Sequence, residues 1–340
     1  MNTISTLGSH CALQVLKGAK DEGFKTKLVC EKKRVELYKR FRFIDEMIIV
    51  DRFNEIKEKK VSDELVESVL IPHGTMISSM SKEEIDRLEI PFFGNKKILY
   101  WEADRRLKNE LLKSANLTIP KSFDSYEEID RLVLVKLHGA AGGKGYFLAW
   151  DKESFMNNFR VLKEKGVINN ENELFIQEYV VGVPVYLQYF YSPINNELEL
   201  LGIDKRYESN VDSIGRIPAR YQDIISASYN VIGNQPLVLR ESLLDEVYKM
   251  GDRFVNACKR LVEPGMIGPF CLEGVYDEDA NFITFEFSGR IVAGTNLYIQ
   301  GSPYSTLLYN EPMSTGRRIA REIKIAREND KLDLILSKNF

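Results

Sequence analysis

The segment Val133–Ala149 reads VLVKLHGAAGGKGYFLA, and it decides the fold that we expect for this chain. Apolar runs at 133–136 and 146–150 are typical of strands, and four of the seven residues from 139 to 145 are glycines. Glycines let a backbone approach a ligand closely and present N–H groups to phosphate oxygens. No Ser or Thr follows Lys144 and no helix follows the loop, so the segment is not a P-loop. It predicts a strand, a glycine-rich flap and a second strand that cover the phosphates of ATP.

Lys136 and the flap are the predicted phosphate-binding groups of this segment. Lys136 stands at the end of the first strand, where its ammonium group would neutralise phosphate charge. A flexible glycine hairpin with surface lysines is the alternative that the loop alone leaves open. The flap residues that we expect to contact ATP are Gly139, Gly142, Gly143, Lys144 and Gly145.

Residues 1–95 alternate between short apolar runs and helical patterns, which favours an α/β domain with a parallel sheet. One helix is expected over Ala12–Ala19, and Gly23 ends it. A break at Pro91–Asn95 closes this part of the chain. The predicted strands are Ile4–Leu7, Lys25–Val29, Asp45–Val50 and Val69–Ile71.

The rest of the chain is expected to form two further lobes, so that the fold as a whole mixes α/β and α+β architecture. We predict a small lobe with the flap over 96–185 and a larger C-terminal lobe over 186–340. The larger lobe is rich in strand patterns up to Ile299 and ends in a charged helix. The predicted helices are Ile98–Ala115, Lys152–Lys165 and Ser314–Lys331, and a further strand is predicted over Leu174–Val180.

Two glutamates give the second chemical signal. Cys271–Tyr276 and Phe282–Phe287 are strand patterns joined by a polar turn, and a symmetric turn places Glu273 opposite Glu286. At roughly 5 Å and an effective dielectric of about 20, two such charges repel by about 3 kcal/mol. A divalent cation such as Mg²⁺ or Mn²⁺ removes that cost, although one glutamate could instead meet solvent or an arginine. Arg290, four residues beyond Glu286, is the expected catalytic group that stabilises a transferring phosphoryl group, although a lone arginine is more often structural.

Two turns after predicted strands give the third signal. Ser9 and His10 lie between the first strand and the first helix. A helix N-terminus offers N–H groups and a positive dipole end to a phosphate, and His10 would add a donor. His73–Thr75 follows a later strand in the same way. Since open α/β sheets bind ligands at the carboxyl ends of their strands, we expect a phosphorylated substrate here. A histidine at such a turn is also a frequent capping or packing residue.

A further strand end lies after the flap. Its backbone groups would read an adenine edge between two lobes, although most such stretches are ordinary core strands. The residues concerned are Gln177, Glu178, Tyr179 and Val180.

The composition describes a globular protein and excludes several classes of function. Hydrophobic residues make up 44% of the 340 residues, and the net charge of −3 gives no basic field for bulk nucleic acid or an anionic membrane. No run approaches the roughly 18 apolar residues that span a bilayer, and the N-terminus lacks a signal-peptide pattern. Four scattered cysteines suit a reducing cytoplasm and argue against a zinc site.

Together, these segments resemble the archaeal-type formate-dependent phosphoribosylaminoimidazolecarboxamide ligases of the ATP-grasp superfamily. The resemblance runs from Ser9 to about Ala326, which is nearly the whole chain. Its segments are long and therefore far more specific than one glycine loop. They are Ser9–Gly23, Gly139–Phe147, Arg206–Asp212, Gly215–Pro218, Val231–Asn234, Gly268–Gly274, Arg290–Asn296 and Ser314–Arg318.

The resemblance implies an ATP-grasp fold with a Rossmann-like N-terminal domain and a ligase reaction of purine (IMP) biosynthesis. ATP would phosphorylate formate, and the amino group of 5-amino-1-(5-phosphoribosyl)imidazole-4-carboxamide (AICAR) would attack the formyl phosphate. The products would be the formamido nucleotide, ADP and phosphate. A homo-oligomer is implied as well, although the sequence carries no interface signature.

The resemblance also implies roles for residues at matching positions. Glu273 and Glu286 would hold magnesium, which agrees with the hairpin argument, and the pair Arg317–Arg318 would add anion contacts. AICAR would be bound by Ser9, His10, Thr75 and Asn234. ATP would be bound by Lys136, the flap, Gln177–Val180 and Glu208.

Several positions depart from the family pattern, and none of them carries assigned chemistry except Thr75, where Ser is usual. The loss of a flap lysine at Ala141 would weaken ATP binding or alter its selectivity. Two alternatives stay open: a diverged paralogue that joins another carboxylate and amine, and a nucleotide-binding protein without turnover. The other departures are Cys11 for Ser, Leu137 for Pro and Gly289 for Ala.

Overall fold

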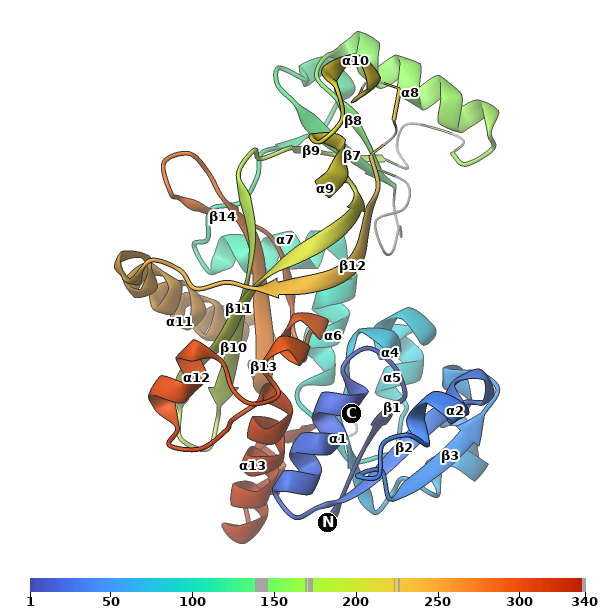
Figure 1. The fold of residues 1–340 in the computed structure, drawn as a ribbon, viewed down its shortest axis with the longest axis vertical. Helices are drawn as coiled ribbons and strands as arrows, with labels where there is room; N and C mark the ends of the chain where they lie inside the picture. Colours follow the sequence, from blue (N-terminus) through green and yellow to red (C-terminus); the bar gives the residue numbers. More distant parts are fainter. Residues whose placement is uncertain (138–145, 169, 171–173, 223, 226, 338–340) are drawn as a thin grey trace.

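The computed structural model describes residues 1–137, 146–168, 170, 174–222, 224–225 and 227–337, and its strands form three sheets (Figure 1). The N-terminal lobe lies at one end of the long axis, the five-stranded sheet lies in the middle, and a small lobe lies at the other end. The predicted flap contacts Gly139, Gly142, Gly143, Lys144 and Gly145, and the departure at Ala141, lie outside the described residues.

The first sheet has the strand order β15-β5-β4-β1-β2-β3 and is parallel apart from β15. The strand order reverses between β1 and β4, where β2 and β3 continue to one side and β5 to the other. Its strands are β1 (Thr3–Leu7), β2 (Lys25–Glu31), β3 (Glu46–Val50), β4 (Ser68–Leu70), β5 (Phe92–Phe93) and β15 (Leu336–Ser337). The four predicted N-terminal strands are therefore confirmed, each to within two residues.

Short helices cover this sheet and connect its strands. The predicted first helix is confirmed as α1, and Gly23 adopts φ +87°, the left-handed conformation in which glycine ends a helix without strain. The helices are α1 (Ala12–Asp21), α2 (Val35–Tyr38), α3 (Lys59–Ser62), α4 (Gly74–Ser79) and α5 (Lys82–Asp86).

The single helix predicted over Ile98–Ala115 is wrong, because the chain forms α6 (Lys96–Ala103) and α7 (Arg105–Ser114) instead. Asp104 separates them with an extended backbone, and its carboxylate accepts hydrogen bonds of 3.0 Å from the N–H groups of Arg106 and Leu107. An aspartate N-cap satisfies N–H groups that a new helix leaves without partners. The break directs residues of both helices toward the candidate site described below.

The small lobe is a four-stranded antiparallel sheet of order β6-β9-β7-β8. β7 pairs directly with β8, which confirms the two strands predicted on either side of the flap. Phe155 and Phe159 of α8 pack against the sheet, because the polar and apolar residues of this helix alternate at helical spacing. The elements are β6 (Ser122–Phe123), β7 (Val133–Leu137), β8 (Tyr146–Ala149), α8 (Lys152–Glu164) and β9 (Leu174–Glu178).

The middle sheet is antiparallel, with the order β12-β11-β10-β13-β14. Side chains of a strand alternate between its two faces, and this sheet uses the alternation fully. One row across the sheet is apolar: Phe287, Leu272, Leu187 and Ile203. The neighbouring row, on the other face, is polar: Glu286, Glu273, Tyr186 and Asp204. The strands are β10 (Val183–Ser192), β11 (Glu197–Asn210), β12 (Tyr229–Pro236), β13 (Gly268–Tyr276) and β14 (Phe282–Ser288).

The apolar face packs against α11 (Leu244–Leu261), an 18-residue helix that the sequence analysis did not predict within its strand-rich section. Val247, Met250 and Phe254 of this helix join the same buried cluster as the apolar row. The polar face stays available for chemistry. The shorter helices of this lobe are α9 (Val211–Ile214), α10 (Ala219–Gln222) and α12 (Pro303–Leu308).

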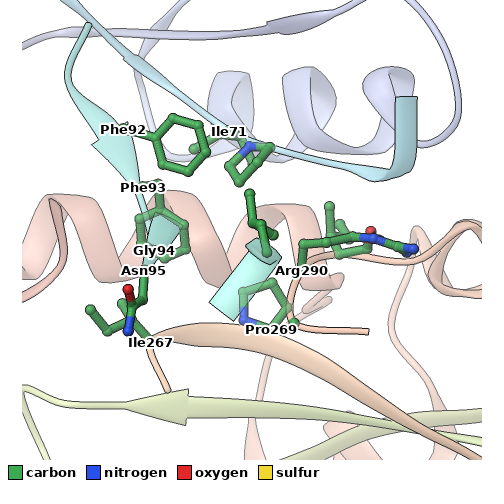
Figure 2. Close-up of a pocket in the computed structure, with 12 residues that line it drawn as sticks. Ile71, Phe92, Phe93, Gly94, Asn95, Ile267, Pro269 and Arg290 are labelled. Atoms are coloured by element: carbon green, nitrogen blue, oxygen red, sulfur yellow. Dashed lines mark hydrogen bonds between the residues drawn. The ribbon is translucent and has the colours of Figure 1, made fainter. Parts of the chain in front are cut away.

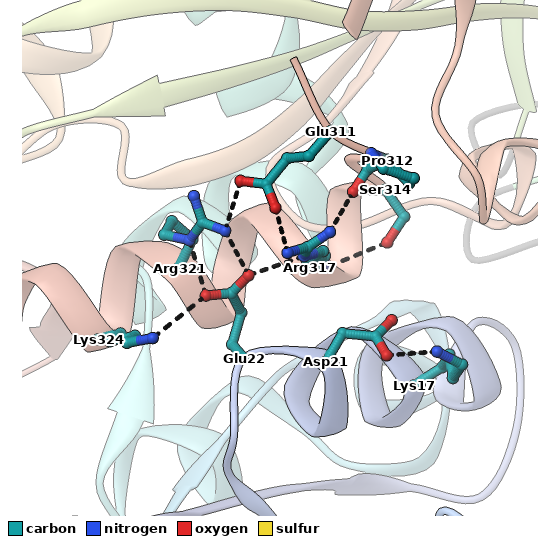
Figure 3. A network of polar contacts seen from close by, with 9 residues as sticks. All are labelled: Lys17, Asp21, Glu22, Glu311, Pro312, Ser314, Arg317, Arg321 and Lys324. Carbon is teal, nitrogen blue, oxygen red and sulfur yellow. Dashed lines mark hydrogen bonds and ion pairs between the residues drawn. The ribbon is translucent and has the colours of Figure 1, made fainter. Parts of the chain in front are cut away.

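Helix α13 (Thr315–Glu328) joins the C-terminal part of the chain to α1. A side chain at Gly18 or Gly316 would overlap the backbone of the other helix, so these glycines set the close approach. Glu22, at the end of α1, pairs with Arg317 at 2.7 Å and with Arg321 at 2.6 Å (Figure 3). Arg318 is buried and paired with two glutamates. Carboxylates of the protein hold both guanidinium groups, so the anion contacts expected of Arg317–Arg318 stay a prediction that requires these ion pairs to open.

Two further expectations can be compared with the structure. Among the described residues, no helix combines the length and the apolar character that crossing a membrane requires. Cys11, Cys30, Cys258 and Cys271 are buried and free, in line with the absence of a paired cysteine motif.

Candidate active site

The two predicted turns lie side by side, because β1 and β4 are neighbours in the parallel sheet. The rings of His10 and His73 are stacked, with centroids 5.4 Å apart and planes 4° from parallel. His73 Nε2 donates to the carbonyl of Leu7 at 2.9 Å, and its Nδ1 accepts from the N–H of Thr75 at 3.3 Å. His73 is thus a buried capping residue, whereas His10 is exposed and Thr75 is half-buried.

His10 has the conformation expected of a residue under functional constraint. Its φ is +54°, a left-handed value that side chains other than glycine rarely adopt, and Asn296 Nδ2 donates to its carbonyl at 3.1 Å. Although part of its surface is exposed, the chain packed around His10 desolvates the ring and lowers its pKa well below the usual value, and Arg290, His73 and Arg206 lower it further. The imidazole is therefore neutral at physiological pH and offers a hydrogen bond, not a charge.

Arg290 reaches the same turns from the other side. A Cβ on Gly74 would lie 3.1 Å from His10 Nε2 and 3.6 Å from Arg290 Cζ, so both groups pack closely over this glycine. Glu102 of α6 holds the arginine: its carboxylate accepts from Arg290 Nη2 at 2.9 Å and from the N–H of Gly289 at 2.8 Å. Burial raises the pKa of Glu102, and the Arg290 guanidinium opposes that effect.

The cavity beside Arg290 is too small for a substrate. Its volume is about 10 Å³, about the least that holds one water molecule. Figure 2 shows apolar residues such as Ile71, Phe92 and Phe93 around it, and the Arg290 guanidinium directed away from them. This arginine therefore acts on the opposite side, toward the two turns.

The glutamate pair has the predicted register. Glu273 lies directly opposite Glu286 in the β13–β14 ladder. Glu273 accepts from Arg206 at 2.7 Å and from the Ser288 hydroxyl at 2.7 Å, and Glu286 pairs with Lys108. Burial would raise the pKa of Glu286, but Lys108 outweighs it, with help from Lys136 and Arg206, and the pKa is lowered.

This pair fits a magnesium ion that takes its other ligands from phosphate and water. Each carboxylate is paired with a cation, Glu273 with Arg206 and Glu286 with Lys108, and these cations stand on flexible side chains that can move aside. Within the described ranges, no group of three or more His, Cys, Asp or Glu residues could hold a metal by protein ligands alone. Any divalent ion here would therefore depend on the nucleotide.

Several cations surround the glutamates on the side of the small lobe. Lys136 Nζ donates to the buried Gln177 side chain at 3.0 Å. Burial lowers the pKa of Lys136 to about 8; Glu286 raises it, and Arg105 and Lys108 lower it further. Sequence reasoning missed Lys108 and Arg105, although both follow the Asp104 cap at positions that share one helix face.

The predicted adenine segment is only partly free to bind. The N–H groups of Glu178 and Tyr179 donate to the carbonyls of Lys121 and Leu132 at 2.8 and 3.0 Å. The Glu178 carboxylate pairs with Arg131 at 3.1 Å. The adenine contacts expected through these two amides would therefore require their present hydrogen bonds to break.

Glu208 lies near the same segment. Burial raises the pKa of Tyr229, and Tyr179 and Glu208 raise it further. The three side chains therefore lie close to one another. Burial also raises the pKa of Glu208 itself, with Arg206 opposing. β11 therefore carries one predicted ATP residue on the same face as the polar row.

Asn234 meets the polar face at its other edge. It lies opposite Arg206 in the β11–β12 ladder and donates to Asp204 at 2.7 Å. The Arg206 guanidinium stacks on the Tyr186 ring at 3.8 Å and lowers the pKa of His10, so it lies between the turns and the glutamates. Sequence reasoning gave no role to Arg206 or Asp204, since only the cross-strand register brings them to the site.

Two family models match the chain. One is described as a protein of unknown function (DUF1246) and covers residues 4–123, and the other as a domain of unknown function (DUF1297) and covers residues 154–337. A curated relative from Nitrosopumilus maritimus is named 5-formaminoimidazole-4-carboxamide-1-(β)-D-ribofuranosyl 5′-monophosphate synthetase. It is 57% identical over 339 residues, which are 98% of this chain and 99% of the relative.

Solved structures give the same fold. The IMP biosynthesis protein PurP from Thermococcus kodakaraensis superposes with a TM-score of 0.80 and is 30% identical, over 98% of this chain and 100% of that one. An ADP complex of PurK, an N5-carboxyaminoimidazole ribonucleotide synthetase, superposes with a TM-score of 0.67 at 12% identity, over 100% of this chain and 79% of that one. The expected ATP-grasp fold is confirmed by these superpositions.

Proposed function

The chain belongs to the family of 5-formaminoimidazole-4-carboxamide-1-(β)-D-ribofuranosyl 5′-monophosphate synthetases, and we propose that it joins formate to the amino group of AICAR, with conversion of ATP to ADP and phosphate, in the biosynthesis of IMP. One observation carries the proposal. The chain matches a synthetase over its full length at 57% identity, and its structure brings His10 and Arg290 close to the Glu273–Glu286 pair. Arg206 lies between them, because it pairs with Glu273 and also lowers the pKa of His10.

AICAR is proposed to bind at the two turns and the edge of the middle sheet. Its phosphate would meet the Ser9 hydroxyl and the N-terminus of α1, where Cys11 supplies no side-chain cap, since the N–H groups of Gly8 and Ser9 already donate to Val29 and Leu7. The neutral His10 imidazole, Thr75 and Asn234 would contact the rest of the nucleotide. These groups stand at the point where the strand order reverses, which is the usual ligand position in such sheets.

ATP is proposed to lie between the small lobe and the polar face. Lys136, Gln177 and Glu208 would contact it, together with Val180 and with the flap residues named above. Glu273 and Glu286 would hold Mg²⁺, which would supply positive charge against the charge that develops in phosphoryl transfer. Lys108 and Arg206, which now neutralise the glutamates, would then be free to turn toward phosphate oxygens.

The proposed reaction consists of two successive steps in one site, a phosphoryl transfer and a formyl transfer. A formate oxygen would attack the γ-phosphorus of ATP, and the AICAR amine would then attack the carbonyl carbon of the formyl phosphate and release phosphate. Arg290, held by Glu102, would stabilise the phosphate charge in both steps. Positioning the amine beside the acyl phosphate favours attack over hydrolysis by water.

The proposal is tested by omitting ATP, formate and AICAR in turn while ADP release and product mass are recorded. We expect ADP and the formamido nucleotide in equal amounts, and only when all three substrates are present. ADP release that continues without formate or AICAR, or a product formed from another amine, would contradict the proposed reaction. The same preparation tests the proposed cytoplasmic homo-oligomer by light scattering.

A further inference from the structure

Asp204 is a buried carboxylate that the reaction described above does not use. Its side chain is 1% exposed, on the polar row of the middle sheet. A Cβ on Gly294 would overlap its carboxylate, so this glycine closes the site over it. Its oxygens are occupied on both sides: Oδ1 accepts from Gln188 Nε2, and Oδ2 accepts from Asn234 Nδ2 at 2.7 Å.

The carboxylate fixes the direction of both amides. An ionised carboxylate only accepts hydrogen bonds, so each amide must present its nitrogen to Asp204 and its oxygen elsewhere. For Gln188, this orientation leaves Oε1 buried and without a hydrogen-bond partner among the described residues. An unpaired buried acceptor costs free energy, and the hydrogen bond to the carboxylate maintains the orientation. Burial raises the pKa of Asp204 to about 6, so the group is ionised at physiological pH.

Asn234 differs from Gln188 in where its oxygen points. The side chain is half-buried, and among the residues that the structure describes its Oδ1 has no hydrogen-bond partner. Asn234 is the cross-strand neighbour of Arg206, the residue that connects the glutamates to His10. The 3-10 segment Ala293–Tyr298 connects the same two places, because Gly294 covers Asp204 and Asn296 donates to the His10 carbonyl.

We propose that Asp204 holds the Asn234 amide so that its Oδ1 accepts a hydrogen bond from an N–H group of the substrate base. Asp204 is then a positioning residue for substrate selection, and this inference rests on the AICAR reaction proposed above. AICAR carries two N–H₂ groups, and we assign that of the carboxamide to Asn234, because the amine is the group that reacts. A related nucleotide with a carboxylate in place of the carboxamide would place a carboxylate oxygen against Asn234 Oδ1. Both oxygens are acceptors, so this nucleotide is rejected.

The inference is tested by binding, so that it does not depend on turnover. Dissociation constants for AICAR and for its 4-carboxylate analogue are measured by calorimetry with the wild-type chain, Asp204→Asn and Asn234→Ala. Asp204→Asn supplies a side chain that donates as well as accepts, so Asn234 is free to rotate. We expect the preference for AICAR over the carboxylate to fall about tenfold in each single variant.

A double-mutant cycle separates positioning from general destabilisation. If Asp204 acts through Asn234, the double variant loses no more selectivity than either single variant. Gln235→Ala, an exposed neighbour on the same strand, is the matched control and should keep the wild-type ratio. Equal loss of affinity for both nucleotides in Asp204→Asn, or additive losses in the cycle, would overturn the inference. A wild-type chain that binds neither nucleotide would overturn the proposed function itself.

Discussion

The two turns of the parallel sheet and the polar face of the middle sheet contribute to one site by different physical means. At the turns, the binding groups are backbone N–H groups and a neutral imidazole, and the buried His73 also has a lowered pKa, about 4, because of burial. On the polar face, the binding groups are charged and already paired, as in Glu273 with Arg206 and Glu286 with Lys108, whereas Arg290, paired with Glu102, lies between the two regions.

The difference shows where ligand binding must break existing interactions. A nucleotide phosphate at the N-terminus of α1 would bind by added hydrogen bonds, with no ion pair to exchange. ATP and a metal at the polar face must exchange partners with buried ion pairs, whose loss without replacement is costly. Substitutions on the polar face should therefore reduce turnover strongly, whereas those at the turns should mainly weaken binding of one substrate.

The largest effect is expected for Glu286→Gln. Loss of a carboxylate removes a proposed magnesium ligand and leaves Lys108 without its partner, so kcat should fall by about a thousandfold. Mn²⁺ affinity in the presence of ATP, followed by electron paramagnetic resonance, should fall as well. Glu278→Gln, in the exposed turn of the same hairpin, is the control. Near-normal activity in Glu286→Gln would show that Glu286 does not hold the metal.

Glu102→Gln should have the next largest effect. The amide still accepts from Gly289, but it no longer neutralises the Arg290 guanidinium. We therefore expect kcat to fall about a hundredfold, with little change in the KM for ATP, formate or AICAR. Arg290→Lys should give a similar loss, because a lysine cannot make the forked contact. If Glu102→Gln lowered the melting temperature without changing kcat, the pair would be structural only.

His10→Ala tests the other region. The KM for AICAR should rise about tenfold and the KM for ATP should change less than twofold, because the imidazole lies at the turns and not at the glutamates. Ser78→Ala, exposed on α4, is the matched control. An effect mainly on ATP would move the nucleotide substrate away from the turns.

The smallest effect is a pH dependence of ATP binding. The pKa of Lys136 is lowered to about 8 by burial, so the ammonium group loses its proton as the pH rises through that value. The dissociation constant for ATP should rise about fivefold between pH 7.5 and 9.5, since a phosphate contact loses its charge. Lys136→Arg stays charged over this range and should give a flat profile. A wild-type profile as flat as that of the variant would remove Lys136 from the phosphate contacts.

The sequence predicts the turn region better than the polar face, for a physical reason. A strand, a turn and a helix N-terminus are encoded within about fifteen residues, so Ser9 and His10 are found by local pattern. The Glu273–Glu286 pair was found too, because one hairpin fixes its register. Asp204 and Arg206 were missed, since their neighbours Tyr186 and Glu273 come from other strands.

The break between α6 and α7 was missed for a similar reason. Asp104 stands in a stretch with continuous helical periodicity, and the N-cap geometry that divides it depends on how α6 and α7 pack on the rest of the chain. Glu102 and Lys108, the partners of Arg290 and Glu286, follow from that break. The three lobes predicted over 1–95, 96–185 and 186–340 stay a prediction about domain limits.

The central claim, that the polar face activates formate and the turns present the amine, is tested most directly with formate labelled by ¹⁸O in both oxygens. One oxygen should appear in the released phosphate and the other in the formamide of the product, because formate attacks the γ-phosphorus before the amine displaces phosphate. We therefore expect one ¹⁸O per phosphate, detected by its ³¹P chemical shift. Phosphate without ¹⁸O, in a reaction that still yields labelled formamido nucleotide, would contradict activation of formate by phosphorylation.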